Sequence, residues 1–388
     1  MDKIIRVMMD LIACEVCGKP FDKTKFVLYE EEMLSLYRLS KTHDLAHLVG
    51  DILIKNNLIT NDEITEKFRK QIMLAVYRYE KMNCELCRLR EILNEAKIPF
   101  MPLKGSVLRQ YYPKPWMRTS CDIDILVYKE DLDKAVKLIT SKLSYKEGFK
   151  SSHDVSLSLN NEIHVELHYD LIEVNCAGNT ETVLDSVWDQ AFCVSNTSEY
   201  TLSDEMFYFY HIAHMAKHFI STGGCGVRSF LDLWVLNHQV LYDVPKRNEL
   251  LKRGGLLTFA LEAERLSMAW FDNDEYTDIS YCMGGYVING GVYGTVENSV
   301  AVQQVVKGGK VRYAISRIWL SYDILKFHYP SLNGRRILLP LYEIRRWCKL
   351  LFCGGAERSL NELRLNHITT DEDQMVIQKM LVSLELEK

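Results

Sequence analysis

The heptapeptide CDIDILV at residues 121–127 places the tightest limit on how this chain can fold. Its apolar residues predict a buried strand, yet Asp122 and Asp124 stand in the front half of that strand. Aspartate is a poor strand former, and a buried carboxylate without a partner costs several kcal/mol. Because side chains alternate across a strand, both carboxylates point the same way, roughly 6.5–7 Å apart along the backbone. Such a pair is typical of a divalent-metal site; the alternative is two solvated acids at an exposed strand end.

Further strands and a helix are predicted around this segment. PFMPL at 99–103 predicts a short strand before it, and EDLDKAVKLITSKL at 130–143 predicts an amphipathic helix after it. FKSSHDVSLSL at 149–159 and EIHVELHYDL at 162–171 predict an antiparallel pair around the turn Asn160–Asn161. Together these elements predict a small mixed sheet with covering helices.

A third acid is available on the last of these strands. Glu166 shares one face with His164 and His168, since residues two apart on a strand point the same way. If this strand lies beside 122–128, Glu166 can approach the aspartates as a third metal ligand or as a general base. The alternative is that Glu166 forms an ordinary salt bridge with a neighbouring residue.

Lys104, Gly105 and Ser106 lie between the first strand and the helix-like sequence VLRQYY. Gly105 lets a ligand approach the backbone closely, and the N-terminus of a helix presents free N–H groups to an anion. Ser106 can donate to a phosphate oxygen, and Lys104 adds a positive charge. An anion cradle followed by Asp-x-Asp on the next strand is what metal-assisted nucleotidyl transfer requires.

The stretch LKGSVLRQYYPKPWMRTSCDIDILV resembles the signature of the DNA-polymerase-β-like nucleotidyltransferase superfamily. More narrowly, it is similar to the bacterial uncharacterised nucleotidyltransferase family, also called nucleotidyltransferase family 5. EIHVELHYDL is similar to the third-acid strand of that family, although the family usually has aspartate where this chain has Glu166. HIAHMAKHF, VRSFLDLW and HYPSLNGRRILLPLYEIRRW resemble its downstream segments, so the resemblance spans roughly residues 95–350.

This resemblance implies a role for each matching position. Gly105, Ser106 and Arg118 would contact the triphosphate. Asp122 and Asp124 would bind magnesium, and Glu166 would complete the metal site or act as the base. The gap between Gly105-Ser106 and Asp122 is longer than in many superfamily members, though it matches this family. For Arg118, a structural ion pair is an equal alternative.

The wider chain divides into three zones. Residues 1–96 and 176–388 predict mostly helices, and residues 97–175 carry the sheet. The expected fold class is therefore α+β and mostly helical overall, with a polymerase-β-like core framed by an N-terminal and a C-terminal helical region. The glycine-rich stretch 284–294 is expected to form a loop, with a lid over the cleft as a weaker alternative; residues 284–310 lack the spacing of a Walker loop.

Composition limits the class of protein. The net charge of −5 argues against a broad nucleic-acid-binding surface. No apolar run is long enough to cross a membrane, and MDKIIRVMMDLIACEVC is a poor signal peptide. The 11 cysteines favour reduced thiols in the cytoplasm. Two CxxC pairs suggest zinc, but their separation is too large for a zinc knuckle, and thiols buried in helices are expected instead; the pairs are Cys14/Cys17 and Cys84/Cys87.

Two further clusters of polar residues stand out, one of histidines and one of arginines. His211, His214 and His218 share one helical face. With Lys217, and with Arg228 and Asp232 of the next helix, this face is expected to border the cleft and contact the nucleotide, or to form a polar core; a metal site is the weaker alternative. Arginine pairs near the C-terminus, Arg335–Arg336 and Arg345–Arg346, form either a basic surface or a solvated helix face.

The sequence thus predicts a Mg²⁺-dependent nucleotidyltransferase. It would move a nucleoside monophosphate from a nucleoside triphosphate to a hydroxyl-type acceptor on a small molecule, peptide or protein, releasing pyrophosphate. Two alternatives stay open. One is a nucleotide-binding regulatory or interaction protein without turnover, which the glutamate at 166 allows. The other is a toxin that modifies a host protein or a tRNA.

Overall fold

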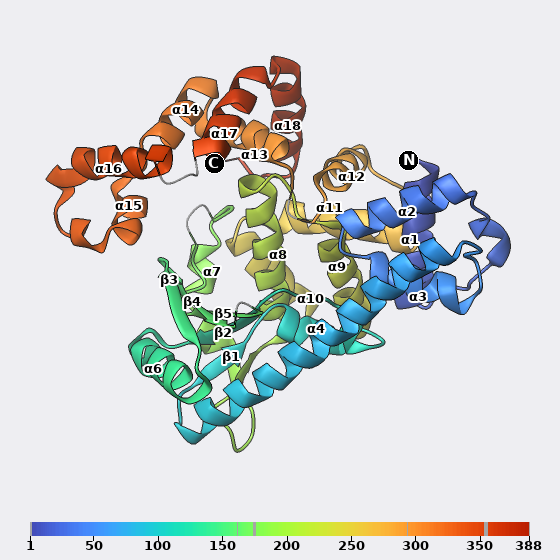
Figure 1. Cartoon of the computed structure of the whole chain (residues 1–388), viewed down its shortest axis with the longest axis horizontal. Coiled ribbons are helices and arrows are strands. Elements are labelled where there is room, and N and C mark those ends of the chain that lie inside the picture. The colour runs from blue at the N-terminus through green and yellow to red at the C-terminus, as the bar shows by residue number, and fades with distance from the viewer. Residues whose placement is uncertain (1, 161, 174–175, 293, 353–355, 388) are drawn as a thin grey trace.

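The computed structural model describes residues 2–160, 162–173, 176–292, 294–352 and 356–387 (Figure 1). Before the sheet the chain forms α1 Lys3–Val16, α2 Glu30–Thr42, α3 Ala46–Lys55 and α4 Asp62–Glu95. The sheet region contains β1 Phe100–Pro102, α5 Gly105–Leu108, β2 Ile123–Val127, α6 Leu132–Leu143, β3 Lys146–Lys150, β4 Asp154–Leu159 and β5 Ile163–His168.

The rest of the chain is mostly helical. It forms α7 Glu181–Leu184, the short strands β6 Ala191–Cys193 and β7 Tyr200–Leu202, α8 Asp204–Ser221, α9 Val227–Gln239, α10 Val244–Arg253 and α11 Leu257–Phe271. It continues with α12 Asp278–Gly290, α13 Val296–Lys307, α14 Lys310–Ile318, α15 Tyr322–His328, α16 Leu339–Phe352, α17 Ala356–Ile368 and α18 Asp371–Ser383. The predicted α+β class, mostly helical with one small mixed sheet as its core, is confirmed.

The five-stranded sheet has the order β1-β2-β5-β4-β3. Strands β2 and β5 run parallel, and every other pair is antiparallel. The register places Asp124 opposite Glu166, so the condition under which Glu166 can approach the aspartates is met. On β4, Ser156 is the antiparallel partner of Glu166.

The two faces of the sheet differ in chemistry. One face carries Ile123, Ile125, Val165 and Leu167, which pack with side chains of α4 and α6 in a hydrophobic cluster. The alternate residues of the same strands point to the other side, where α8 and α9 stand. The acids on β2 and β5 therefore face away from the apolar cluster. Because the carboxylates lie on the polar face, the apolar residues of the same strand can still be buried.

A second hydrophobic cluster unites the helical regions that flank the sheet. It runs from Met8 of α1 through Phe68 of α4 and Tyr208 of α8 to Leu381 of α18. The proposed division at residues 96 and 175 therefore marks a change of secondary structure, and apolar packing continues across both boundaries. Within the described residues, no helix is long and apolar enough to cross a membrane.

Two expectations about local structure were wrong. Residues 284–290 of the glycine-rich stretch belong to helix α12, where the apolar spacing of Met283 and Val287 against the core outweighs the low helix propensity of glycine; Tyr293 lies outside the described residues. The segment 149–159, expected to be one strand, is divided between the end of β3 and the whole of β4. A turn closed by the hydrogen bond from Ser151 N to Asp154 O separates the two strands. Of the predicted turn Asn160–Asn161, Asn161 lies outside the described residues.

Candidate active site

A cavity of about 320 Å³ lies between the polar face of the sheet and helices α8 and α9. Strands β2 and β5 contribute carboxylates and a histidine to one wall, and α8 and α9 contribute cationic and imidazole groups to the other. Seven of the eight residues assigned to the site from sequence line this cavity, among them Lys104, Gly105, Asp122, Asp124 and Glu166. Arg118 and Lys217 line it as well, whereas Ser106 does not.

Asp124 is the most strongly held acid of the site. It is buried, and its Oδ1 lies 2.6 Å from Lys104 Nζ and 2.9 Å from His168 Nε2. Burial alone would raise the pKa of this carboxyl, but the charges of Lys104 and His168 overcome burial and hold the pKa well below its usual range. Asp124 is therefore ionised at neutral pH.

Glu166 converges on the same point. Its Oε2 lies 3.5 Å from His168 Nε2 and 3.8 Å from Lys104 Nζ. The hydrogen bond from His168 lowers the pKa of Glu166. Ligand atoms of Asp124, Glu166 and His168 all lie within 4.8 Å of one another, the one such group of three among the described residues. Two carboxylates and one imidazole thus lie close together around the ammonium group of Lys104.

Lys104 and His168 carry the compensating positive charge. Burial opposes protonation of Lys104, yet Asp124 raises its pKa well above the ordinary value. Burial likewise opposes protonation of His168, and its hydrogen bonds to Asp124 and Glu166 raise its pKa. Lys104 also has φ of 45° and ψ of −121°, a backbone conformation that non-glycine residues rarely adopt. Strained residues of this kind cluster at functional sites.

Asp122 stands directly before β2 and borders the cavity. Burial, together with the charge of Asp124, raises the pKa of Asp122 to about 6. The two aspartates that look alike in the sequence thus differ in the pH at which they lose their proton. Asp124 stays ionised, and Asp122 takes up a proton in mildly acidic solution.

The phosphate turn differs in part from its prediction. Gly105 opens α5, and an added Cβ there would stand 3.0 Å from Ser120 Cβ, so a larger residue would require the Ser120 side chain to shift. The backbone N–H of Ser106 donates to Leu103 O at 3.1 Å. Ser120, next to this turn, does border the cavity, and its hydroxyl accepts from Arg109 Nη2 at 2.7 Å. Sequence reasoning missed Ser120 and Arg109, because no spacing rule ties them to the glycine.

Arg118 is anchored from α9. Its Nε donates to both carboxylate oxygens of Asp232, at 2.8 and 3.0 Å, and the hydroxyl of Tyr112 donates to Asp232 Oδ1 at 2.7 Å. Asp232 is buried. Nη1 of Arg118 donates to Thr119 O at 2.5 Å. Arg118 therefore forms the structural ion pair that was its alternative role, and it also borders the cavity.

The three predicted histidines of α8 all border the cavity. Nε2 of His214 and Nε2 of His218 lie 3.1 Å apart, and His211 contacts Ser229 O at 3.2 Å. Burial lowers the pKa of each, to about 4 for His218. These imidazoles are accordingly neutral at pH 7 and add hydrogen-bonding capacity without charge.

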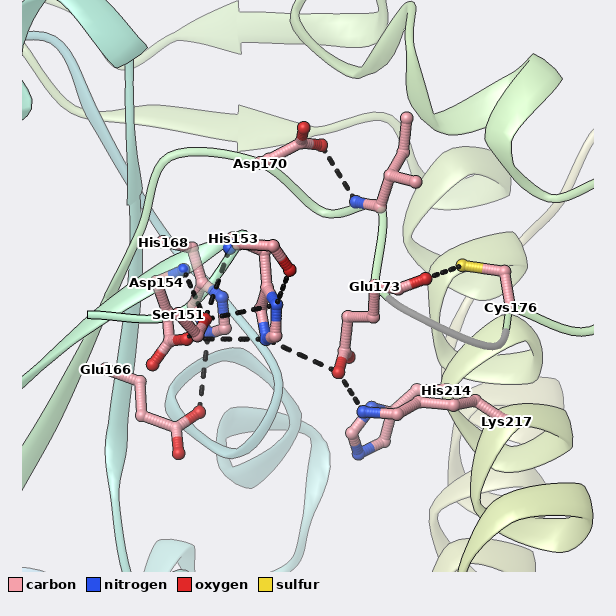
Figure 2. A network of polar contacts seen from close by, with 12 residues as sticks. Ser151, His153, Asp154, Glu166, His168, Asp170, Glu173, Cys176, His214 and Lys217 are labelled. Carbon is pink, nitrogen blue, oxygen red and sulfur yellow. Dashed lines mark hydrogen bonds and ion pairs between the residues drawn. The ribbon is translucent and has the colours of Figure 1, made fainter. Parts of the chain in front are cut away.

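Figure 2 shows a polar network that links α8 to the strands. Glu173 pairs with Lys217 and stands 3.4 Å from His153 Nε2. The ring of His153 stacks on that of His168 with centroids 5.9 Å apart. Glu173 and His153 border the cavity and were not predicted, since both lie in connecting segments where no periodicity marks them.

Among the described residues, the cysteines form no group of three that could hold a metal ion. Cys17 packs against the core, whereas Cys84 and Cys87 are exposed on α4. The expectation that both CxxC pairs are buried in helices is thus wrong for the second pair. Cys353 lies outside the described residues.

Comparison with known proteins gives one solved structure and one family. No curated protein matches the chain. The solved structure is the Thermotoga maritima CCA-adding enzyme complexed with tRNA, with 15% identity and a TM-score of 0.29, over 81% of this chain and 86% of that one.

The family is described as uncharacterised nucleotidyltransferase, and its match covers residues 29–272. These residues include the whole five-stranded sheet and helices α8 and α9, and hence both walls of the cavity. The chain belongs to the uncharacterised nucleotidyltransferase family.

Proposed function

We propose that this protein is a Mg²⁺-dependent nucleotidyltransferase that moves a nucleoside monophosphate from a nucleoside triphosphate to a hydroxyl-type acceptor. The acceptor would belong to a small molecule, a peptide or a protein side chain. The observation that carries the proposal is the convergence of Asp122, Asp124 and Glu166 on one cavity, in a chain of a nucleotidyltransferase family.

The donor set fits a magnesium ion. Asp122, Asp124 and Glu166 offer carboxylate oxygens, the hard ligands that Mg²⁺ prefers. The ammonium of Lys104, held between Asp124 and Glu166, shows that this point attracts positive charge. When bound there, Mg²⁺ would offset charge on the attacked phosphorus and on the departing pyrophosphate.

Cationic groups around the acids suit a triphosphate. Lys104, Arg118 and Lys217 border the cavity, and Gly105 allows a phosphate to approach the backbone. We keep Ser106 as a weaker candidate, because Ser120 borders the cavity in its place. Lys217 would have to share its charge between phosphate and Glu173, with which it is paired.

As the alternative to completing the metal site, Glu166 suits the part of general base. Its lowered pKa keeps it ionised and able to accept a proton. In the transfer, the acceptor oxygen bonds to the α-phosphorus while the bond from that phosphorus to the pyrophosphate oxygen breaks. The acceptor hydroxyl proton passes to Glu166, and pyrophosphate leaves with the bonding electrons.

Calorimetry with each common ribonucleoside triphosphate and Mg²⁺ tests the site. We expect wild type to bind at least one triphosphate in a Mg²⁺-dependent manner, and the double variant Asp122→Ala/Asp124→Ala to lose that dependence. Binding to no triphosphate, or binding indifferent to Mg²⁺ and to the substitutions, would contradict the proposal.

A second candidate is a nucleotide-binding regulatory protein without turnover. It is favoured by the occupation of Asp124 by both Lys104 and His168, which compete with a metal for the same oxygen. Triphosphate binding with no pyrophosphate release over hours, whatever acceptor is supplied, would select this candidate over the first.

A further inference from the structure

The C-terminal arm, defined here as residues 310–352, differs in charge from the rest of the chain. It holds nine Lys or Arg against two Asp or Glu, a net charge of +7, while the whole chain carries −5. Its three helices α14, α15 and α16 project from the upper left of the molecule in Figure 1. The arm also lies beyond residues 29–272, the part matched by the family.

Helix α16 is tied to the arm mainly through the side that carries Glu343, Arg346 and Trp347, and Tyr342 beside it contacts Ser331 and Tyr329. Glu343 accepts a hydrogen bond from Leu320 N at 2.6 Å. On the same face, Arg346 and Trp347 donate to Ile318 O at 2.7 and 2.8 Å. These contacts fix which side of the helix points outward.

The outward side carries an apolar stripe. Leu341, Ile344 and Leu351 of α16 are three and seven residues apart and so share one helical face, with exposed fractions of 61%, 62% and 62%. Ile337, in the turn just before α16, and Phe352, at its end, add exposed apolar side chains at 90% and 86%. Arg345 and Lys349, both exposed, flank this stripe along the helix. Val311 and Ile315 of α14 add exposed apolar area in the same arm, at 72% and 58%.

Exposed apolar area of this extent marks an interaction surface, and its charge narrows the partner. A second copy docking through the same stripe would bring two arms of +7 together, and like charges across an interface oppose association. A nucleic acid would satisfy the charge, but the stripe is mostly aliphatic and offers few rings for stacking on bases. Several of the arm's aromatic rings already face its own cations: Arg336 lies over Tyr322, Arg345 over Tyr329 and Arg346 over Trp347.

An anionic lipid surface satisfies both features at once. A helix that lies in a membrane interface buries Leu, Ile and Phe side chains below the headgroups, while flanking Lys and Arg contact anionic lipids. We propose that the C-terminal arm docks the protein on an anionic membrane surface, with the stripe of α16 inserted between headgroups. This inference does not depend on the proposed transferase activity.

Co-sedimentation of the full chain with lipid vesicles tests the proposal. The vesicles contain phosphatidylcholine alone, or phosphatidylcholine with roughly 30% phosphatidylserine, an anionic lipid of cytoplasmic leaflets. We expect wild type to bind the anionic vesicles, to bind neutral ones much more weakly, and to dissociate as ionic strength rises.

Two double variants separate the apolar and the ionic contribution. Leu341→Gln/Ile344→Gln removes apolar area, and Arg345→Gln/Lys349→Gln removes two charges. Each should weaken binding to anionic vesicles about tenfold or more. A matched control, Met73→Gln/Tyr77→Gln, changes two residues of α4 that are 71% and 58% exposed, and it should bind like wild type. Thermal unfolding of each variant should match wild type, because all six side chains are exposed or flank the exposed stripe.

Four outcomes would overturn the proposal. They are absence of vesicle binding, equal binding to neutral and anionic vesicles, arm variants that bind as well as wild type, and arm-dependent association with RNA or with a second copy in place of vesicles. The last is checked by RNA binding and by sedimentation of the protein over a range of concentrations.

Discussion

Asp124 accepts from both Lys104 and His168, whereas no hydrogen bond or ion pair of Asp122 is found among the described residues. Changing each to asparagine should therefore separate catalysis from stability. Both variants should lose transfer activity by about 100-fold or more, because each removes charge from the reacting centre. Asp124→Asn should also lose about 3 kcal/mol of unfolding free energy, since it leaves two buried cations without their carboxylate. Activity assays measure the loss of transfer, and denaturant melts in the presence of a chelator measure the loss of stability. Equal stability of the two variants would contradict this account.

The raised pKa of Asp122 predicts a pH dependence. Burial and Asp124 disfavour its ionised form, so its contribution to stability is fully present below about pH 4 and is lost as pH rises through about 6. Divalent-metal affinity should change the opposite way and rise through about pH 6, because the ionised carboxylate is the ligand. Mn²⁺ titration by calorimetry across this range tests the prediction. In Asp122→Asn the step near pH 6 should vanish, and its persistence would assign the step to another group.

Lys104 competes with a metal for Asp124 and Glu166. Lys104→Met should therefore bind Mn²⁺ in the absence of nucleotide about tenfold more tightly than wild type, while binding triphosphate more weakly. The control is Lys217→Met, because Lys217 is paired with Glu173 and leaves those two acids unchanged. Calorimetric titration with Mn²⁺ alone compares the three proteins. Unchanged or weaker Mn²⁺ binding in Lys104→Met would show that its ammonium does not compete.

At the scale of elements, α9 holds the segment that leads into β2. Asp232 of α9 binds Arg118 and Tyr112, and all three are buried. Asp232→Asn keeps the shape but removes the charge, so we expect about 3 kcal/mol less unfolding free energy and weaker triphosphate binding as Arg118 loses its anchor. Denaturant melts and calorimetry measure both. Asp133, whose side chain is 96% exposed, offers the matched control Asp133→Asn, which should behave as wild type. Wild-type stability and wild-type triphosphate binding in Asp232→Asn would contradict the anchoring role.

How far the sequence leads is visible in the same elements. Alternation along 122–128 and 162–168 correctly predicted two strands with their acids on one face, because period two is a local property. The contacts of Lys104 with Asp124 and of Arg118 with Asp232 could not be predicted, since they join residues 20 and 114 positions apart through the packing of separate elements. The helix over residues 284–290 was missed for a related reason: tertiary packing overrode the preference of glycine for loops.

At the scale of the whole molecule, helices from both ends of the chain share one hydrophobic cluster that supports the polar face of the sheet. The acids can converge there because Lys104 and His168 lie against Asp124 and Glu166, which lowers the cost of burying charge. The basic arm lies apart from this arrangement and has a net charge opposite to that of the chain. The cavity and the arm can therefore be tested independently.

The most direct test of the central claim is transfer of label from a triphosphate carrying ³²P at its α-phosphorus, with Mg²⁺ and a cell extract as the source of acceptor. Pyrophosphate is measured in the same reaction. The account predicts that label becomes covalently attached to an acceptor with an equal amount of pyrophosphate released, and that Asp122→Asn, which keeps its fold, abolishes both. Label transfer that persists in Asp122→Asn, or triphosphate binding with neither label transfer nor pyrophosphate release, would contradict it.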